Sequence, residues 1–142
     1  MDYWIEMFFS KTSSGIEQGK GKYQTCSLTH GANMTNYLFI ESRDPFESRD
    51  TQFVEQTATA LTERGHEVTV FLVQNGVLAS RRNARDSYLH RLAQAGVNVL
   101  ADDFALSERG IQSSDLHDSV RPSSIDTLVD ALLQRDTKAI WH

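Results

Sequence analysis

Charged side chains follow the apolar runs of this sequence, at places where they could bind an anion or an acidic partner. The polar segments after the first three runs contain Arg43, Arg49, Arg81, Arg82, Arg85, Asp102 and Asp103. Arginine forms paired hydrogen bonds with carboxylates and phosphates. In the turn after the second run, Asn75 and Gly76 can present backbone groups to the same ligand. The hypothesis is a polar pocket or docking edge, and the alternative is a charged edge that contacts only solvent.

These side chains meet only if the apolar runs are parallel strands of one sheet. The runs 36–40, 66–73 and 97–100 are separated by stretches in which apolar residues recur at helical spacing. Parallel neighbours need a crossover of a dozen or more residues, which is usually a helix. Ligands of such sheets bind at the carboxyl ends of the strands. We predict an α/β three-layer sandwich of flavodoxin-like class, with a mostly parallel sheet of about five strands.

Helix boundaries follow from glycines and capping residues. Gly65 and Gly96 are the expected left-handed stops of the first two helices, and Asn83 is the expected cap of the second. Ser123 and Asp126 are expected to form a capping box at the start of the last helix.

The last helix carries the most regular apolar stripe of the chain. Its members are Ile125, Leu128, Val129, Leu132 and Leu133. Before this helix, residues 112–122 are polar and irregular, with a possible strand near 119–120. After it, 138–141 is predicted as the final strand, with Trp141 completing the core or a subunit contact.

Length and composition fit a single domain with an extension. Residues 10–33 are rich in Gly, Ser, Thr and Lys without an apolar period, so we predict a flexible extension over 1–33 and a folded domain over 34–142. The formal charge is −5, and an acidic body argues against direct nucleic-acid binding. No apolar run approaches the roughly 20 residues of a membrane helix, so we expect no membrane contact.

The chain has one cysteine, Cys26. A single cysteine cannot form an internal disulfide or a multi-cysteine metal site, and the cytoplasm is the expected compartment. Asp115, His117 and Asp118 have metal-capable side chains, but a polar loop gives the same residues by chance, so no metal is expected. Neither a dinucleotide fingerprint nor a phosphate-binding loop occurs, and we expect no cofactor, with a loosely held flavin as the alternative.

Four segments together resemble the DsrE/DsrF-like family of sulfur-relay proteins. They are GHEVTVFL (65–72), NGV (75–77), AGVNV (95–99) and SERGI (107–111), with AIW (139–141) closing the chain as in that family. The resemblance covers 35–142 and implies a small α/β subunit that assembles into homo-oligomers or hetero-oligomers with sulfur-relay proteins. It also implies a sulfur-carrying cysteine a few residues before the Arg-Gly pair at 109–110.

At about that position the sequence has Asp102, with Asp103 beside it. A carboxylate is a poor nucleophile towards sulfur and cannot hold a persulfide. Cys26 lies in the predicted extension, and we expect it to be incidental. We therefore expect a non-catalytic subunit or binding module of sulfur metabolism rather than an enzyme. The alternative is a small-ligand-binding protein or enzyme that uses Asn75, Gly76, Arg81, Arg82, Asp102, Asp103 and Arg43.

Overall fold

The computed structural model describes residues 34–47, 51–84 and 88–142. The predicted extension 1–33 lies outside the described residues. The strands are β1 (Asn36–Glu41), β2 (Glu67–Leu72), β3 (Asn98–Asp102), β4 (Arg121–Ser123) and β5 (Thr137–Trp141). The α-helices are α2 (Thr51–Glu63), α3 (Tyr88–Gln94), α4 (Asp103–Glu108) and α5 (Ile125–Leu133), and two 3₁₀ helices are η2 (Gln74–Ser80) and η3 (Ser113–Asp115).

The five strands form one sheet in the order β4-β3-β2-β1-β5, and every neighbouring pair is parallel. The prediction of an α/β fold with about five mostly parallel strands is therefore confirmed. From β1 to β4 the chain moves in one direction across the sheet, and only the last crossover returns past β1 to the opposite edge. The direction of the connections thus reverses beside β1.

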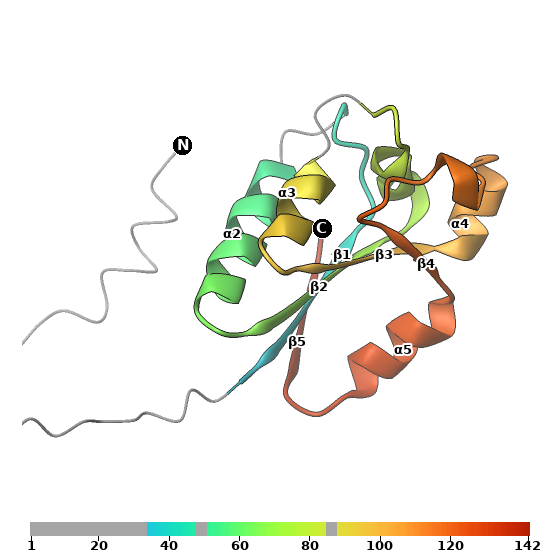
Figure 1. The fold of residues 1–142 in the computed structure, drawn as a ribbon. Helices are drawn as coiled ribbons and strands as arrows, with labels where there is room; N and C mark the ends of the chain where they lie inside the picture. Colours follow the sequence, from blue (N-terminus) through green and yellow to red (C-terminus); the bar gives the residue numbers. More distant parts are fainter. Residues whose placement is uncertain (1–33, 48–50, 85–87) are drawn as a thin grey trace, which may run out of the picture. The chain divides into compact units, whose positions relative to one another are not determined.

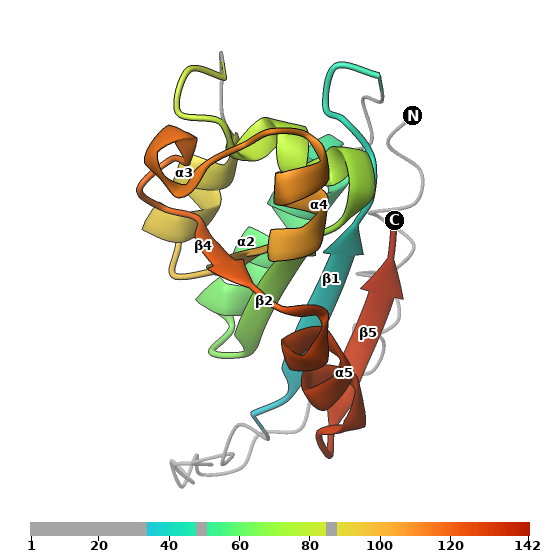
Figure 2. The same ribbon diagram turned by 90° about the vertical axis from the view of Figure 1, so that its right-hand side faces the viewer.

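The reversal decides which face of the sheet each helix covers. Right-handed crossovers that move in one direction place their helices on the same face, and a crossover in the other direction places its helix on the opposite face. Figure 1 shows α2 and α3 on one face and α5 on the other. In the view of Figure 2, α5 lies in front of the sheet, and α2 and α3 lie behind it. The fold is a three-layer sandwich, as predicted.

The two faces carry cores of very different size. The larger core joins α2, α3, α4 and η2 to the sheet through residues such as Phe39, Val70, Leu89 and Leu92. The smaller core contains the buried residues Leu38, Ile40, Phe71, Val73 and Leu128. One helix of nine residues, α5, supplies the outer layer of this second face. Since no second helix of the described ranges lies beside it there, α5 has little apolar surface on which to pack.

Several predicted boundaries move in the structure. The third strand extends to Asp102, and α4 begins at Asp103, so these two residues lie at a strand-helix junction and not in a loop. The fourth strand lies at 121–123 and not near 119–120; Pro122 is tolerated there because β4 is an edge strand. The second helix was predicted to start near its cap at Asn83, but this start falls partly on residues 85–87, which lie outside the described residues.

The prediction of a capping box from Ser123 and Asp126 is wrong. Ser124 occupies the N-cap of α5, and its side chain makes no capping hydrogen bond. Ser123 is instead the last residue of β4, paired in register with Asp102. The strand takes this residue because the ladder hydrogen bonds of β4 continue to it.

The stripe of α5 is largely uncovered. Leu128 is buried against the sheet, whereas Ile125, Val129, Leu132 and Leu133 are exposed. Trp141 is also exposed, so it does not complete the core of this chain. Among the described residues, no helix is long and apolar enough to cross a membrane.

Gly76 explains how the turn after β2 packs against the end of β1. The predicted turn at 74–76 is the start of η2, and Gly76 donates its N–H to the carbonyl of Ser42 at 3.1 Å. A Cβ atom at this position would lie 2.3 Å from the carbonyl oxygen of Glu41. Only glycine allows this approach of two backbones.

Replacing Gly76 with alanine is therefore expected to destabilise the protein by about 3 kcal/mol, because the backbone of Glu41 must shift. Gly65→Ala is the matched control. Gly65 has φ +84, and a methyl group added there would meet no atom within 4 Å, so the cost is about 1 kcal/mol of backbone strain. Urea unfolding of both variants measures the difference. Equal losses of stability would contradict the close-approach explanation.

Candidate functional site

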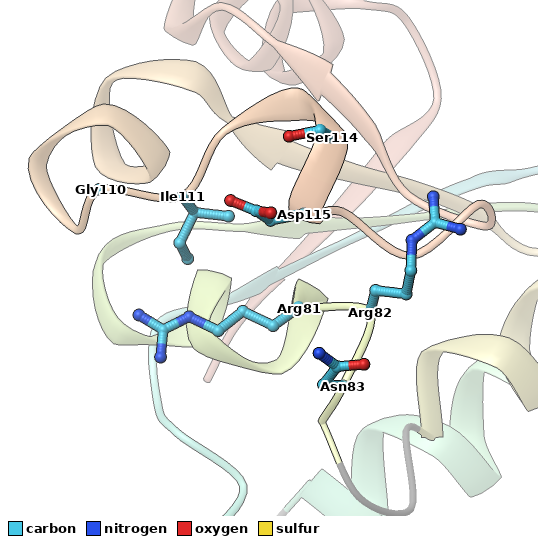
Figure 3. Close-up of a pocket in the computed structure, with 7 residues that line it drawn as sticks. All are labelled: Arg81, Arg82, Asn83, Gly110, Ile111, Ser114 and Asp115. Atoms are coloured by element: carbon cyan, nitrogen blue, oxygen red, sulfur yellow. The ribbon is translucent and has the colours of Figure 1, made fainter.

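Arg81 and Arg82 line an open pocket of about 270 Å³. The other lining residues are Asn83, Gly110, Ile111, Ser114 and Asp115, so the pocket lies between the end of η2 and the segment from α4 to η3 (Figure 3). Ile111 is buried, and the charged members are exposed. The pocket therefore combines a small apolar surface with groups of both charges.

Backbone hydrogen bonds join the two walls of this pocket. Arg81 forms an isolated antiparallel bridge with Leu116. The N–H of Arg82 donates to the carbonyl of Asp115 at 2.7 Å, and the N–H of His117 donates to the carbonyl of Ser80 at 2.8 Å. The two walls of the pocket are thus joined through their backbones.

The two arginines differ in their contacts. Nη2 of Arg82 lies 2.8 Å from Oδ1 of Asp118, in an exposed ion pair. Arg81 extends along the pocket wall below Ile111 (Figure 3). Within the described ranges, its guanidinium has no hydrogen-bond or ion-pair partner. Arg81 is therefore the cation of this pocket that is available to a ligand.

Asn75 and Gly76 contribute to the scaffold. The side-chain oxygen of Asn75 accepts hydrogen bonds from Nη2 of Arg109 at 2.9 Å and from Nε at 3.3 Å. Nη1 of Arg109 also donates to the carbonyl of Ala105 at 3.2 Å. Asn75 thus joins the turn after β2 to α4, and the N–H of Gly76 is bonded to Ser42.

Asp102 caps the N-terminus of α4. It is buried at the end of β3, and its Oδ2 accepts a hydrogen bond from the N–H of Ala105 at 3.0 Å. A carboxylate that caps a helix in this way is stabilised by the amide it bonds and by the helix dipole. Its Oδ1 is also buried and has no partner among the described residues. Asp103, the next residue, is exposed.

The predicted site residues do not form one site. Arg81 and Arg82 share the pocket of Figure 3, whereas Asn75, Gly76, Asp102, Asp103 and Arg43 are absent from its lining. Arg43 is exposed after β1. Arg49 and Arg85, which belonged to the same hypothesis, lie outside the described residues.

Five pocket residues were not predicted from the sequence as members of the site, namely Asn83, Gly110, Ile111, Ser114 and Asp115. They line the pocket because the bridge between Arg81 and Leu116 brings η3 beside the end of η2. No residue pattern indicates this antiparallel contact between two short irregular segments. The Arg-Gly-Ile segment at 109–111 was the nearest available signal, since Gly110 and Ile111 line the pocket.

A buried carboxylate at the end of β1 was also missed. Glu41 is fully buried, its Oε1 accepts the N–H of Arg43 at 3.0 Å, and its Oε2 lies 3.1 Å from Nδ1 of His142. These contacts offset the cost of removing the charge from water. The sequence did contain an indication of this carboxylate, because the acidic residue Glu41 follows directly after the apolar run 36–40.

Tyr88 lies in the same electrostatic environment. Its hydroxyl is buried and has no hydrogen-bond partner in the described part of the chain. Burial raises the pKa of Tyr88 above its ordinary value, and the negative charges of Glu41, Glu55 and Asp44 raise it further. Tyr88 is therefore a neutral phenol and not an acid or base for catalysis near neutral pH.

Metal binding has no geometric support in 34–47, 51–84 and 88–142. These ranges contain no group of three or more His, Cys, Asp or Glu side chains that could hold a metal ion. Asp118 of the suspected cluster pairs with Arg82, and Nδ1 of His117 accepts the N–H of Ser119 at 3.2 Å.

Comparisons with known proteins agree with this architecture. No curated protein matches the sequence. The YchN protein from E. coli has a similar crystal structure, with a TM-score of 0.69 and 20% identity over 77% of this chain and 100% of that chain. A protein of unknown function, MTH1491 from Methanobacterium thermoautotrophicum, gives a TM-score of 0.63 and 19% identity over 78% of this chain and 100% of that chain.

These structural similarities show the fold. The family assignment comes from the sequence, because the model of the DsrE/DsrF-like family matches residues 35–138. The match spans the whole sheet except the last residues of β5. This chain belongs to the DsrE/DsrF-like family.

Proposed function

We propose that this chain is a non-catalytic DsrE/DsrF-like subunit that associates with a second copy of itself and does not carry sulfur. Its family supports a role related to sulfur relay. The observation that carries the proposal is the apolar face of α5 and β5. This face consists of Ile125, Val129, Leu132, Leu133 and Trp141, whose exposed fractions are 50%, 47%, 44%, 78% and 68%.

Single exposed apolar residues are common on protein surfaces, but a contiguous group marks an interaction site. The four residues of α5 recur at helical spacing, so they lie on one side of the helix. Trp141 belongs to β5, the edge strand next to β1. A large aromatic residue is also the type most enriched where interfaces bind strongly.

The charges at the two ends of α5 favour a second copy as the occupant. Asp126 lies in the first turn, and Arg135 follows the last turn. In a dimer whose two-fold axis runs perpendicular to α5, the two α5 helices pack antiparallel, and each Asp126 lies near the end of the partner helix that carries Arg135. In this arrangement Asp126 and Arg135 provide opposite charges at the two ends of the apolar contact.

Asp102 accounts for the proposed lack of sulfur transfer. The family resemblance places the carrier cysteine at about this position, and Asp102 is held there by its bond to the N–H of Ala105. Carrying sulfane sulfur requires a thiolate that attacks and later leaves. A carboxylate with a capping task has neither property.

Two further parts of the proposal concern organisation and location. We assign residues 34–142 as the working domain, with 1–33 as an extension to it, because the apolar periodicity starts at the first strand. We place the protein in the cytoplasm, since its one cysteine cannot form an internal disulfide. Self-association depends on neither of these two assignments.

Leu133→Glu is expected to weaken self-association at least about tenfold, because the dimer would bury two new charges. Phe46→Glu is the matched control, since Phe46 is 76% exposed and lies after β1, away from the α5 stripe. Sedimentation velocity over a range of concentrations measures both variants and the unchanged protein. A strictly monomeric unchanged protein, or equal effects of the two substitutions, would contradict the proposal.

Asp102→Cys, made together with Cys26→Ser, is expected to gain the ability to bind one sulfur atom from a polysulfide donor. The new thiolate can accept the hydrogen bond that Ala105 now donates to the carboxylate. Ser123→Cys in the same background is the control, because Ser123 is the register partner of Asp102 on β4 and does not cap α4. Intact-protein mass spectrometry reports the added sulfur.

If the folded Asp102→Cys protein takes up no more sulfur than the Ser123→Cys protein, the assignment of Asp102 to the carrier position is wrong. Circular dichroism of both variants shows whether the fold is retained.

A further inference from the structure

We propose that the pocket beside Arg81 binds a small zwitterion of the amino-acid type, with the ligand carboxylate on Arg81 and the ligand ammonium on Asp115. This inference is independent of the proposed self-association, because the pocket is formed by the segment after η2, the loop after α4 and η3, and not by α5 or β5.

Two of the charged side chains in the pocket lack an ion-pair partner among the described residues, which favours such a ligand. Arg82 is neutralised by Asp118. The guanidinium of Arg81 has no partner among the described residues. The carboxylate of Asp115 accepts, from the described part of the chain, only a long hydrogen bond of 3.4 Å, from the N–H of Gln112 to Oδ2. The two charges lie on facing walls of one pocket, yet they do not pair with each other within the described chain (Figure 3).

A separated cation and anion in one pocket match a ligand that carries the opposite charges at a similar separation. Arginine binds a carboxylate through two parallel hydrogen bonds, which fixes the orientation of the ligand. A simple anion would be attracted by Arg81 and repelled by Asp115. A simple cation would be attracted by Asp115 and repelled by Arg81. Only a ligand with both charges can pair with Arg81 and with Asp115 at the same time.

The size of the pocket restricts the ligand further. A volume of about 270 Å³ lies just below the usual range for ligand pockets, roughly 300–1,000 Å³. This space suits a small molecule such as an amino acid, which is smaller than a nucleotide or a flavin. Ile111 gives an apolar surface for a short side chain, and Asn83 and Ser114 add polar groups that can hydrogen-bond it.

Backbone hydrogen bonds join the two walls of the pocket, which favours binding. The bridge between Arg81 and Leu116 and the short bond from Arg82 to Asp115 hold the two charged residues at fixed places on the backbone. A preorganised backbone lowers the cost of ordering the site when a ligand binds. The exposed charges limit the affinity, because solvent screens them.

The test is a titration of the full ¹⁵N-labelled chain, followed by its amide NMR signals. The probes are free L-alanine, L-serine and L-glutamate, the N-acetyl and carboxamide derivatives of each, and sodium sulfate. At least one free amino acid is expected to shift the amides of Asn83, Ser114 and Asp115 to saturation. Its two derivatives are expected to bind about tenfold more weakly, since each lacks one charge-assisted contact.

Substitutions separate the two charges. Arg81→Gln is expected to remove the preference for the free acid over its carboxamide, and Asp115→Asn the preference for the free amine over its N-acetyl derivative. Arg64→Gln is the matched control, because Arg64 is exposed after α2 and is absent from the pocket lining. This control is expected to bind like the unchanged protein.

The proposal is overturned if none of the three amino acids shifts these amides, or if sulfate or the N-acetyl derivatives bind as well as the free acids. The second outcome would define a plain anion site. Failure of self-association would not change any of these results, so the two proposals fail separately.

Discussion

This structure depends on the contacts of the buried residue Glu41, because three chain segments meet at this residue. Its carboxylate contacts the backbone of Arg43 and the ring of His142, and its carbonyl accepts the N–H of Val73 at 2.9 Å. Gly76 packs against the same carbonyl. The ends of β1, β2 and β5 are thereby held together at the point where the chain changes direction across the sheet. In open parallel sheets a ligand crevice forms at such a reversal. Here the buried Glu41 and its contact with His142 lie at the reversal, and the pocket beside Arg81 is formed by the segments that follow η2 and α4.

The reversal also sets the imbalance between the two faces of the sheet. Since the first three crossovers run in one direction, α2, α3 and α4 contribute to one core, and α5 alone covers the other face. A helix of nine residues buries Leu128 and leaves most of its apolar stripe in solvent. The handedness of the crossovers is therefore the physical origin of the proposed interface. The same topology places Asp102 at the junction of β3 and α4, where it caps the helix.

The sequence predicted the layers, four of the five strands and the glycine stops because these depend on periodicity and on local backbone conformation. Gly65 and Gly96 have φ values of +84 and +90, as the expected helix stops require. The site was predicted only in part. Arg81 and Arg82 were identified, but Asp115 was not, because the contact between η2 and η3 is an isolated antiparallel bridge with no pattern in the sequence. The stripe of α5 was recognised as helical, yet periodicity cannot tell whether a stripe faces a core or a partner. Trp141 shows the same limit, since an apolar residue at the end of an edge strand suits either surroundings.

The central claim is that the chain associates without carrying sulfur, and native mass spectrometry tests both parts in one spectrum. The unchanged protein is incubated with isotopically labelled polysulfide, separated from excess donor and measured at several protein concentrations. We expect a concentration-dependent dimer whose mass equals that of two unmodified chains. A monomer at every concentration, or a chain that retains one labelled sulfur atom and passes it to an acceptor thiol, would contradict the account.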